Sequence, residues 1–225
     1  MKMLGFDTST SACTVALLNG DVVSVRHQHA PMQQAHLILP MIQELLDSSS
    51  LTVNELDAIA YGCGPGSFTG IRISNSVAQG IGFAIQKPII PISSLATLAQ
   101  TAFLEQQWSR LLVAMDARMG KIYWATYTIN ASGLAELIGN ERLSQPEEIT
   151  SSYHTDLYGI GDGWEAYKDI LIGSNLTLKG IDARQLPSAK ALLQLATLKY
   201  EKGEWITAAQ ALPVYLSRDP LSTNA

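Results

Sequence analysis

Short apolar runs and longer apolar stripes alternate along the chain, and each predicts an element. Runs with a period of two, or fully apolar runs of four to eight residues, are typical of strands, whereas apolar positions three and four apart are typical of helices. The first half predicts strands at 2–6, 13–18, 22–28, 56–61 and 89–92, and helices at 35–47, 71–85 and from Ser93 or Ser94 to about Gln106. The order is three strands, helix, strand, helix, strand, helix.

The second half predicts a similar order with shorter helices. Its strands are expected at 110–115, 121–129, 134–143 and 156–160, and its helices at 164–172 and 189–201. Two βββαβα lobes indicate an α/β fold, the two-lobed actin-like/hexokinase-like (ASKHA) duplication. We expect an N-terminal lobe at 1–106, joined by the C-terminal tail at about 205–225, and a C-terminal lobe at 107–204.

The helix predicted at 71–85 is apolar on two faces. One stripe consists of Ile73, Val77, Gly80, Ile81 and Ala84, and Ser74, Ala78, Phe83 and Ile85 contribute to another. No charge follows Arg72 until Lys87, and a helix that is apolar nearly all round is buried nearly all round. One face can lie on the sheet, and Gly80 with Gly82 would let another helix lie close to the other face. The alternative is a central helix covered by its own chain.

A glycine-rich turn precedes this helix, in the segment Tyr-Gly-Cys-Gly-Pro-Gly-Ser-Phe-Thr-Gly-Ile-Arg at 61–72. Ser67 or Thr69 can cap the helix. Backbone N–H groups at such a turn can hold a phosphate, but the same sequence suits a tight strand-to-helix corner without a ligand. The Gly-Lys-Ser/Thr of a Walker A loop is absent, and so is the dinucleotide-binding fingerprint.

A polar turn follows the first strand. In actin-like and sugar-kinase-like ATPases, an Asp with hydroxyls in this place meets the ATP phosphates; an ordinary hairpin with a hydrogen-bonded Asp is the alternative. The candidate nucleotide-binding residues are Asp7, Thr8, Ser9, Thr10, Gly64 and Gly66. An ATPase or phosphotransferase would also need a phosphate loop in the second lobe, and residues 116–120 carry no such sequence.

Histidine and cysteine spacing predicts no metal centre. His27 and His29 share a strand face, where two partly exposed edge histidines are the alternative to metal ligands. Cys13 and Cys63 are the only cysteines, and we expect two free buried thiols. A catalytic thiol at Cys63 is the alternative, but no histidine is placed in sequence to activate it.

Composition narrows the function classes. Hydrophobic residues make up 47% of 225 residues, charged residues 16%, and the formal net charge is −5. The nearest approach to a basic cluster is Arg110, Arg118 and Lys121, so we do not expect the chain to hold RNA alone. There is no apolar run of membrane-spanning length and no signal-peptide core, so we expect a cytoplasmic protein that does not bind a membrane.

Four segments resemble one family. Gly-Pro-Gly-Ser-Phe-Thr-Gly-Ile-Arg at 64–72 resembles the signature of the bacterial TsaB (YeaZ) proteins, which take part in making threonylcarbamoyladenosine in tRNA. Phe-Asp-Thr-Ser-Thr at 6–10, Asp-Ala-Arg-Met-Gly-Lys-Ile-Tyr-Trp at 116–124 and Pro-Val-Tyr-Leu at 213–216 agree with it. The tail departs from the family's Pro-x-Tyr-Leu-Arg, because Ser217 precedes Arg218.

The resemblance implies a non-catalytic partner of a TsaD-type enzyme, joined by a TsaE-type ATPase. TsaD proteins bind a metal through two histidines four residues apart on the helix that carries His36, but Met32 and Pro40 occupy these positions here. We therefore expect no metal site and no catalytic residues. We expect no confidently bound cofactor, ATP or ADP at a complex interface as the alternative, and tRNA contact only through the complex.

The family pairs its subunits through the two helices that correspond to about 33–47 and 69–86. The interface residues expected from this are His36, Leu39, Ile73, Val77, Gly80 and Ile81. Without the partner, the same surface is expected to form a homodimer.

Two features of the second lobe are open to two interpretations. Asp116 and Arg118 are a functional ion pair or a hairpin-turn salt bridge. The glycines at 159, 161 and 163 lie at a strand end and are weak evidence for a binding loop.

Overall fold

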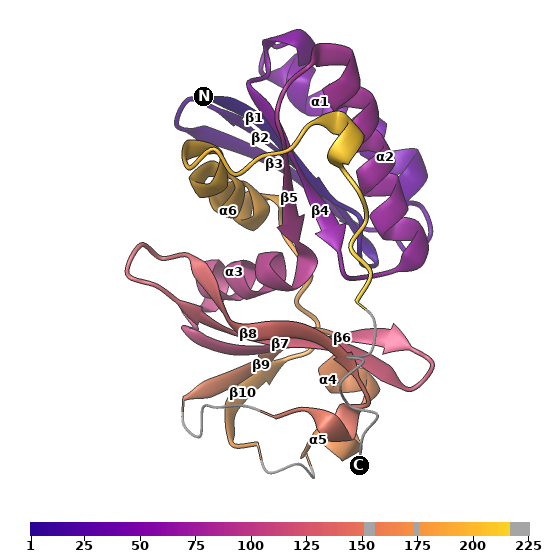
Figure 1. The fold of residues 1–225 in the computed structure, drawn as a ribbon, viewed down its shortest axis with the longest axis vertical. Coiled ribbons are helices and arrows are strands. Elements are labelled where there is room, and N and C mark those ends of the chain that lie inside the picture. Colours follow the sequence, from indigo (N-terminus) through magenta and orange to yellow (C-terminus); the bar gives the residue numbers. More distant parts are fainter. Residues whose placement is uncertain (151–155, 173–175, 217–225) are drawn as a thin grey trace. The chain divides into compact units, whose positions relative to one another are not determined.

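The computed structural model describes residues 1–150, 156–172 and 176–216. They form two compact units: the first contains 1–97 and 186–214, and the second contains 98–185 and begins again at Tyr215. Each unit has its own five-stranded sheet (Figure 1). In the described part of the chain, no helix combines the length and the apolarity that crossing a bilayer requires.

The first unit is built on a mixed sheet. Its strands are β1 (Lys2–Asp7), β2 (Ala12–Asn19), β3 (Val22–His29), β4 (Ala58–Gly64) and β5 (Ile89–Ser93), in the order β3-β2-β1-β4-β5. β1, β2 and β3 are antiparallel neighbours, whereas β4 and β5 run parallel to β1. β1 and β4 are buried almost throughout, because they lie in the middle of a sheet that is covered on both faces.

Helices cover both faces of this sheet. α1 (Gln34–Ser48) and α2 (Phe68–Ile85) lie on one face, and α6 (Ala189–Glu201) lies on the other (Figure 1). A three-residue turn, η1 (Val53–Glu55), leads into β4, and α3 (Ser94–Gln106) follows β5. α1 buries the apolar stripe that the sequence indicated, namely Ile38, Met41, Ile42, Leu45 and Leu46.

The position of α6 corrects the expected lobe boundary. We expected residues 189–201 in the second lobe, but α6 packs on β1, β2 and β5 of the first sheet. Leu192 and Leu193 are buried against Met3, Ile90 and Ile92, so the first sheet would lose its apolar cover without this helix. The N-terminal segment of the first unit ends at Thr97, inside α3, whereas we expected this boundary near Gln107; the chain returns to the unit at Leu186.

The chain after α6 stays in the first unit as far as Val214. Ile206 and Ile89 exchange two backbone hydrogen bonds of 2.9 Å, which pairs the tail with the edge strand β5. The short turn η3 (Ala208–Gln210) then packs on α2, and Val214 N donates to Cys63 O at 2.8 Å. The departure at Ser217 and Arg218 falls outside the described residues.

The second unit repeats the topology of the first. Its strands are β6 (Arg110–Arg118), β7 (Lys121–Ile129), β8 (Ala135–Ser144), β9 (Leu157–Ile160) and β10 (Leu178–Asp182), in the order β10-β9-β6-β7-β8. Reversed, this is the order of the first sheet, with the same antiparallel and parallel pairs. The predicted fold class, a two-lobed α/β duplication of actin-like type, is confirmed.

Two elements of the second unit differ from the sequence prediction. The helix expected at 164–172 is two short helices, α4 (Gly163–Ala166) and α5 (Lys168–Ile172), which meet at Tyr167. The strand β10 was not predicted, because Leu178–Asp182 carries only two large apolar residues among polar and glycine positions. The turn η2 (Pro146–Glu148) follows β8.

Candidate functional site

The glycine motif forms a sharp corner between β4 and α2. β4 ends at Gly64, whose φ of 105° is a conformation that side-chain-bearing residues rarely adopt, and the Gly64–Pro65 peptide bond is cis. Ser67 is the residue that caps α2: its Oγ accepts a hydrogen bond of 3.0 Å from Gly70 N. The predicted strand, turn and helix are therefore present, with Ser67 rather than Thr69 as the cap.

The glycines in this corner allow it to pack directly on the turn after β1. A Cβ at Gly62 would overlap the carboxylate of Asp7, and a Cβ at Gly70 would overlap Thr8 O. At Gly66 it would lie 2.5 Å from Ser9 O. Ser67 N donates to the same Ser9 O at 2.7 Å. The motif and the Asp7 turn are thus in direct contact, and this contact requires glycine.

The amides of Thr8 and Ser9 and the hydroxyl of Thr8, which could hold a phosphate, are engaged within the protein. Thr8 N donates to Ser74 Oγ at 3.0 Å, and Ser9 N donates to Asp7 Oδ1 at 2.6 Å. The hydroxyl of Thr8 donates to Gly70 O at 2.7 Å. Thr10 Oγ1 accepts from Ala12 N at 3.3 Å. The structure therefore brings the candidate nucleotide-binding residues together, but as a closed hydrogen-bonded corner.

Asp7 is a fully buried carboxyl group whose partners are uncharged. Its Oδ1 accepts from the N–H and the hydroxyl of Ser9, and its Oδ2 accepts from Ser94 Oγ at 3.2 Å. Burial raises the pKa of Asp7 above its ordinary value, and these hydrogen bonds lower it only in part. Such a group favours its protonated form more than an exposed aspartate does.

Both cysteines are free and buried, as predicted. Burial, and the nearby Asp7 charge to a smaller extent, raise the pKa of the Cys13 thiol to about 12. The Sγ of Cys63 donates to Ile92 O at 3.3 Å. A thiol is nucleophilic only as thiolate, so Cys13 is built as an inert core residue.

The three histidines in the described part of the chain lie apart from any ligand cluster. His27 and His29 are exposed on β3, which is an edge strand of the first sheet. His36 is exposed on α1, where Pro40 lies four residues further on. Across residues 1–150, 156–172 and 176–216, no three His, Cys, Asp or Glu side chains are grouped so as to hold a metal ion.

An exposed groove separates α1 from α2. Its volume is about 450 Å³, and its lining includes Leu39, Phe68, Thr69, Arg72, Ile73 and Val77. The side chain of Leu39 is 56% exposed and that of Phe68 is 59% exposed. The guanidinium of Arg72 lies 3.5 Å from the centre of the Phe68 ring, where a cation is attracted to the aromatic face. This apolar groove with one cation at its end is what we call the α1–α2 face.

Three of the six expected interface residues, Leu39, Ile73 and Val77, line this groove together. His36 and Gly80 are exposed on α1 and α2, and a Cβ at Gly80 would meet nothing within 4 Å. Ile81 is half-buried and packs on the core of the first unit. The interface itself stays a prediction.

Two expectations about α2 are wrong, and two residues were missed. Gly82 does not face a partner, because a Cβ there would lie 2.5 Å from Ile89 Cδ1. Phe83 was placed in a buried stripe but is 80% exposed. Phe68 and Arg72 were missed as neighbours because the helix was started at Ile71; their spacing of four residues was the available signal.

In the second unit, Asp116 and Arg118 form a hairpin-turn ion pair. Arg118 Nη1 lies 3.0 Å from Asp116 Oδ2, and Arg118 N donates to Asp116 Oδ1 at 2.8 Å. Tyr167 OH donates to the same oxygen at 3.0 Å. The glycines at 159, 161 and 163 give close packing of β9 and α4, since a Cβ at Gly159 would lie 2.7 Å from the Trp164 ring. The first feature is therefore a salt bridge within a hairpin turn, and the glycines serve the packing of β9 against α4.

Asp162 lies beside this pair. Its Oδ1 accepts from Asp116 N at 2.9 Å. Burial, more than any neighbouring charge, raises the pKa of Asp162 above its ordinary value.

Comparison with known proteins covers nearly the whole chain. A family model described as "TsaD: tRNA N6-adenosine threonylcarbamoyltransferase" matches residues 28–222. The protein named "tRNA threonylcarbamoyladenosine biosynthesis protein TsaB" of Escherichia coli K12 is 36% identical over 96% of this chain and 94% of its own length. Its namesake in Haemophilus influenzae is 36% identical over 97% and 94%.

Solved structures agree with the sequence comparison. "YeaZ from Pseudomonas aeruginosa" matches with a TM-score of 0.91 and 41% identity, covering 96% of this chain and 99% of that one. A second Pseudomonas aeruginosa structure, described as an uncharacterized protein with similarity to peptidase YEAZ, gives 0.91 and 40% with the same coverage. The chain belongs to the TsaB (YeaZ) family.

Proposed function

We propose that this chain is a non-catalytic subunit in the formation of threonylcarbamoyladenosine in tRNA. Its partner is a TsaD-type catalytic paralogue, and it acts through the α1–α2 face. Relatives named for this biosynthesis match it over nearly their full length. A separate TsaE-type subunit acts as the ATPase, with the nucleotide at an interface of the complex. The chain contacts tRNA only as part of that complex.

The exposed apolar groove of the α1–α2 face is the observation that carries this proposal. Between Phe68 and Ile85 the only charged residue is Arg72. Leu39 and Phe68 are largely exposed in this groove, which the half-buried Ile73 and Val77 also line. An exposed apolar surface of this kind marks an interaction site. A standard interface buries about 800 Å² on each partner, and two adjacent helix faces are large enough to supply this.

The closed Asp7 corner supports a binding role over the rival phosphotransferase. The amides of Thr8 and Ser9 already have acceptors inside the protein. The carboxyl of Asp7 is fully buried and its pKa is raised, whereas a group that positions a metal or water has to be ionised and accessible. Nucleotide turnover by the chain alone would contradict the proposal.

Light scattering on the chain alone and mixed with a TsaD-type partner tests the interface. We expect a homodimer that converts to a one-to-one heterodimer. Gly80→Arg should abolish both, because a Cβ at Gly80 meets nothing within 4 Å and the added side chain would occupy exposed surface of α2 that the partner is proposed to cover. The fold of this variant can be checked by its unchanged circular dichroism.

The matched control is Ala131→Arg, which adds the same charge at an exposed turn of the second unit. It should leave both assemblies intact. A chain that stays monomeric and ignores the partner contradicts the proposal, and so does a Gly80→Arg variant that still forms the heterodimer.

A further inference from the structure

A second apolar pocket lies in the first unit, on the other flank of α2. Its volume is about 360 Å³. One wall is the C-terminal end of α2 and the loop to β5, with Phe83, Lys87 and Pro88; the other is the tail, with Trp205, Ile206 and Ala209. None of these residues belongs to the α1–α2 face, and the function proposed above makes no use of the pocket.

The walls come from segments far apart in sequence, and backbone contacts hold them in place. Ile89 and Ile206 exchange two hydrogen bonds of 2.9 Å directly beside the pocket. Gln79 Nε2 donates to Ala211 O at 2.8 Å, which fixes the tail to α2 beyond the turn η3. Gly82 lets β5 lie close to α2 beside the pocket, because a Cβ there would lie 2.5 Å from Ile89 Cδ1, whereas it would make only ordinary contact with Ala208. The pocket is therefore preformed in the chain.

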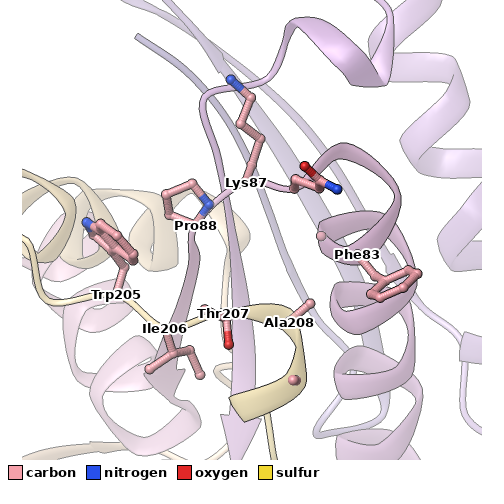
Figure 2. Close-up of a pocket in the computed structure, with 10 residues that line it drawn as sticks. Phe83, Lys87, Pro88, Trp205, Ile206, Thr207 and Ala208 are labelled. Atoms are coloured by element: carbon pink, nitrogen blue, oxygen red, sulfur yellow. The ribbon is translucent and has the colours of Figure 1, made fainter.

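Two large aromatic side chains border the pocket and remain largely open to solvent. Phe83 is 80% exposed and Trp205 is 46% exposed. Figure 2 shows Trp205 beside Pro88 and Ile206 on the tail side of the pocket, and Phe83 on α2 at the far side with its ring directed away from Trp205. Aromatic walls around a concave apolar site, with few polar groups, are characteristic of ligand pockets.

The charge at the pocket has one sign. Among the described residues, Lys87 is the only charged one in the lining, and Figure 2 shows its side chain above Pro88 with the ammonium directed away from the other lining residues. Within the described part of the chain, no carboxylate lies within ion-pair distance of its ammonium group. Its flexible four-carbon stem allows this ammonium to reach a ligand at the mouth of the pocket.

We propose that this pocket binds a small amphipathic anion, an aromatic group that carries a carboxylate. The ring lies in the pocket, to whose lining Phe83 and Trp205 contribute the aromatic side chains, and the carboxylate pairs with Lys87. Aromatic rings gain from stacked or edge-to-face contact in addition to burial, and a charge-assisted hydrogen bond is stronger than a neutral one. The absence of acidic lining residues favours an anion over a cation of the same shape.

Three ligands with one carbon skeleton test this on the complete chain: 3-phenylpropionate, 3-phenylpropanol and 3-phenylpropylamine. Tryptophan emission is excited at a wavelength that the phenyl ring does not absorb, so Trp205 reports on binding. The carboxylate should bind with a dissociation constant of about 1 mM or lower, which small ligands of this size commonly reach. It should bind roughly tenfold more tightly than the alcohol, and the amine should bind most weakly.

Variants then locate the binding. Lys87→Gln should remove the roughly tenfold preference for the carboxylate and leave the alcohol unchanged. Ala209→Phe should abolish binding of all three ligands, because it fills the mouth from an exposed position without touching the core. Ala131→Phe is the matched control in the second unit and should bind as the original chain does. Trp205→Phe should lose the emission change while calorimetry still records binding.

Several results would overturn the proposal. These are no binding of the carboxylate, equal binding of the three ligands, or binding that survives Ala209→Phe. Because the measurement uses the chain without a TsaD-type partner, its failure would leave the proposed subunit function standing.

Discussion

The two units place an aspartate at equivalent turns, and the two turns are built differently. Asp7 ends β1 and Asp116 lies near the end of β6, the corresponding strands of the repeated sheets. Asp7 is fully buried among two serine hydroxyls and an amide, and no cation contacts it in the described part of the chain. Asp116 is held by Arg118, whose side chain is 84% exposed.

This difference shows that turns at equivalent places in one topology can hold an aspartate in two ways, by uncharged hydrogen-bond donors or by an ion pair. The first turn is sealed by the glycine motif, so it favours an uncharged acid and a fixed backbone. In the second turn the Asp116 side chain is only 10% exposed, but its partner Arg118 is largely in water, where an ion pair contributes little. The repeat conserves the path of the chain, while burial decides the chemistry of each turn.

The helices that pack beside the two turns differ in length. α2 has 18 residues and its first turns contact the Asp7 turn, whereas α4 and α5 have four and five. The sealed turn therefore lies against a long helix that also lines the α1–α2 face. The proposed partner surface belongs to the unit whose phosphate-type turn is closed, which is consistent with a binding role for that unit.

The largest expected effect is on the reactivity of the Cys13 thiol, which lies near the Asp7 turn. Because burial raises the pKa of the Cys13 thiol to about 12, native Cys13 should hold roughly a thousandth of the thiolate of an ordinary cysteine. Labelling with iodoacetamide at pH 8, followed by mass spectrometry, should therefore modify Cys13 at least that much more slowly in the native than in the unfolded chain. Labelling at comparable rates would show that the turn is open.

Gly70→Ala should disrupt the contact between the glycine motif and the Asp7 turn. Its Cβ would overlap the backbone carbonyl of Thr8, which cannot move without displacing the turn, so we expect a loss of about 2–3 kcal/mol or more in the free energy of unfolding. Urea denaturation measures this loss. Gly80→Ala is the matched control on the same helix, and it should gain up to about 1 kcal/mol because its Cβ meets nothing. Equal effects at the two sites would contradict the packing role of the motif.

The pH dependence of stability in Asp7→Asn should show whether the buried Asp7 turn favours an uncharged side chain. Since the folded state raises the pKa of Asp7, it binds more protons than the unfolded chain, and this group lowers stability as pH rises through the window above the unfolded value. The amide imitates the protonated acid: Oδ1 still accepts from Ser9, and Nδ2 can donate to Ser94 Oγ. We therefore expect the variant to be at least as stable as the original at pH 7.

The advantage of Asp7→Asn should shrink toward pH 4, because both forms are then uncharged. Thermal unfolding measured from pH 4 to pH 8 records this, with Asp116→Asn as the control in the second unit. A variant that is strongly destabilised at pH 7 would instead indicate that the ionised form of Asp7 is required.

Local pattern sufficed to predict most elements and the corner between β4 and α2. The apolar runs at β1, β2 and β4, the glycine cluster and the capping serine at Ser67 each act over a few residues, so they can be read from one sequence. The repeat of strand order was predicted for the same reason. The groove residues Leu39, Ile73 and Val77 were placed together only through the resemblance to the family.

The errors concern contacts between distant segments. The periodicity of α6 indicates an apolar face but not which sheet it covers, and it covers the first one. Phe83 and Gly82 were assigned to the wrong faces of α2 because the tail occupies the flank beside them. The closure of the Asp7 turn also depends on Gly70, about 60 residues away in sequence, so no local rule could predict it.

Arg118→Gln should have the smallest effect, and this completes the comparison. The ion pair with Asp116 is 3.0 Å long, but most of the arginine side chain is in water, so its loss should cost less than about 1 kcal/mol of the free energy of unfolding. Gln keeps the backbone N–H that donates to Asp116 Oδ1, and Tyr167 still donates to the same oxygen. Urea denaturation in low and high salt measures the effect, which should diminish further as salt screens the charges. A loss above about 2 kcal/mol that persists in high salt would mean that the second turn also depends on a desolvated charge, and the contrast between the two turns would no longer hold.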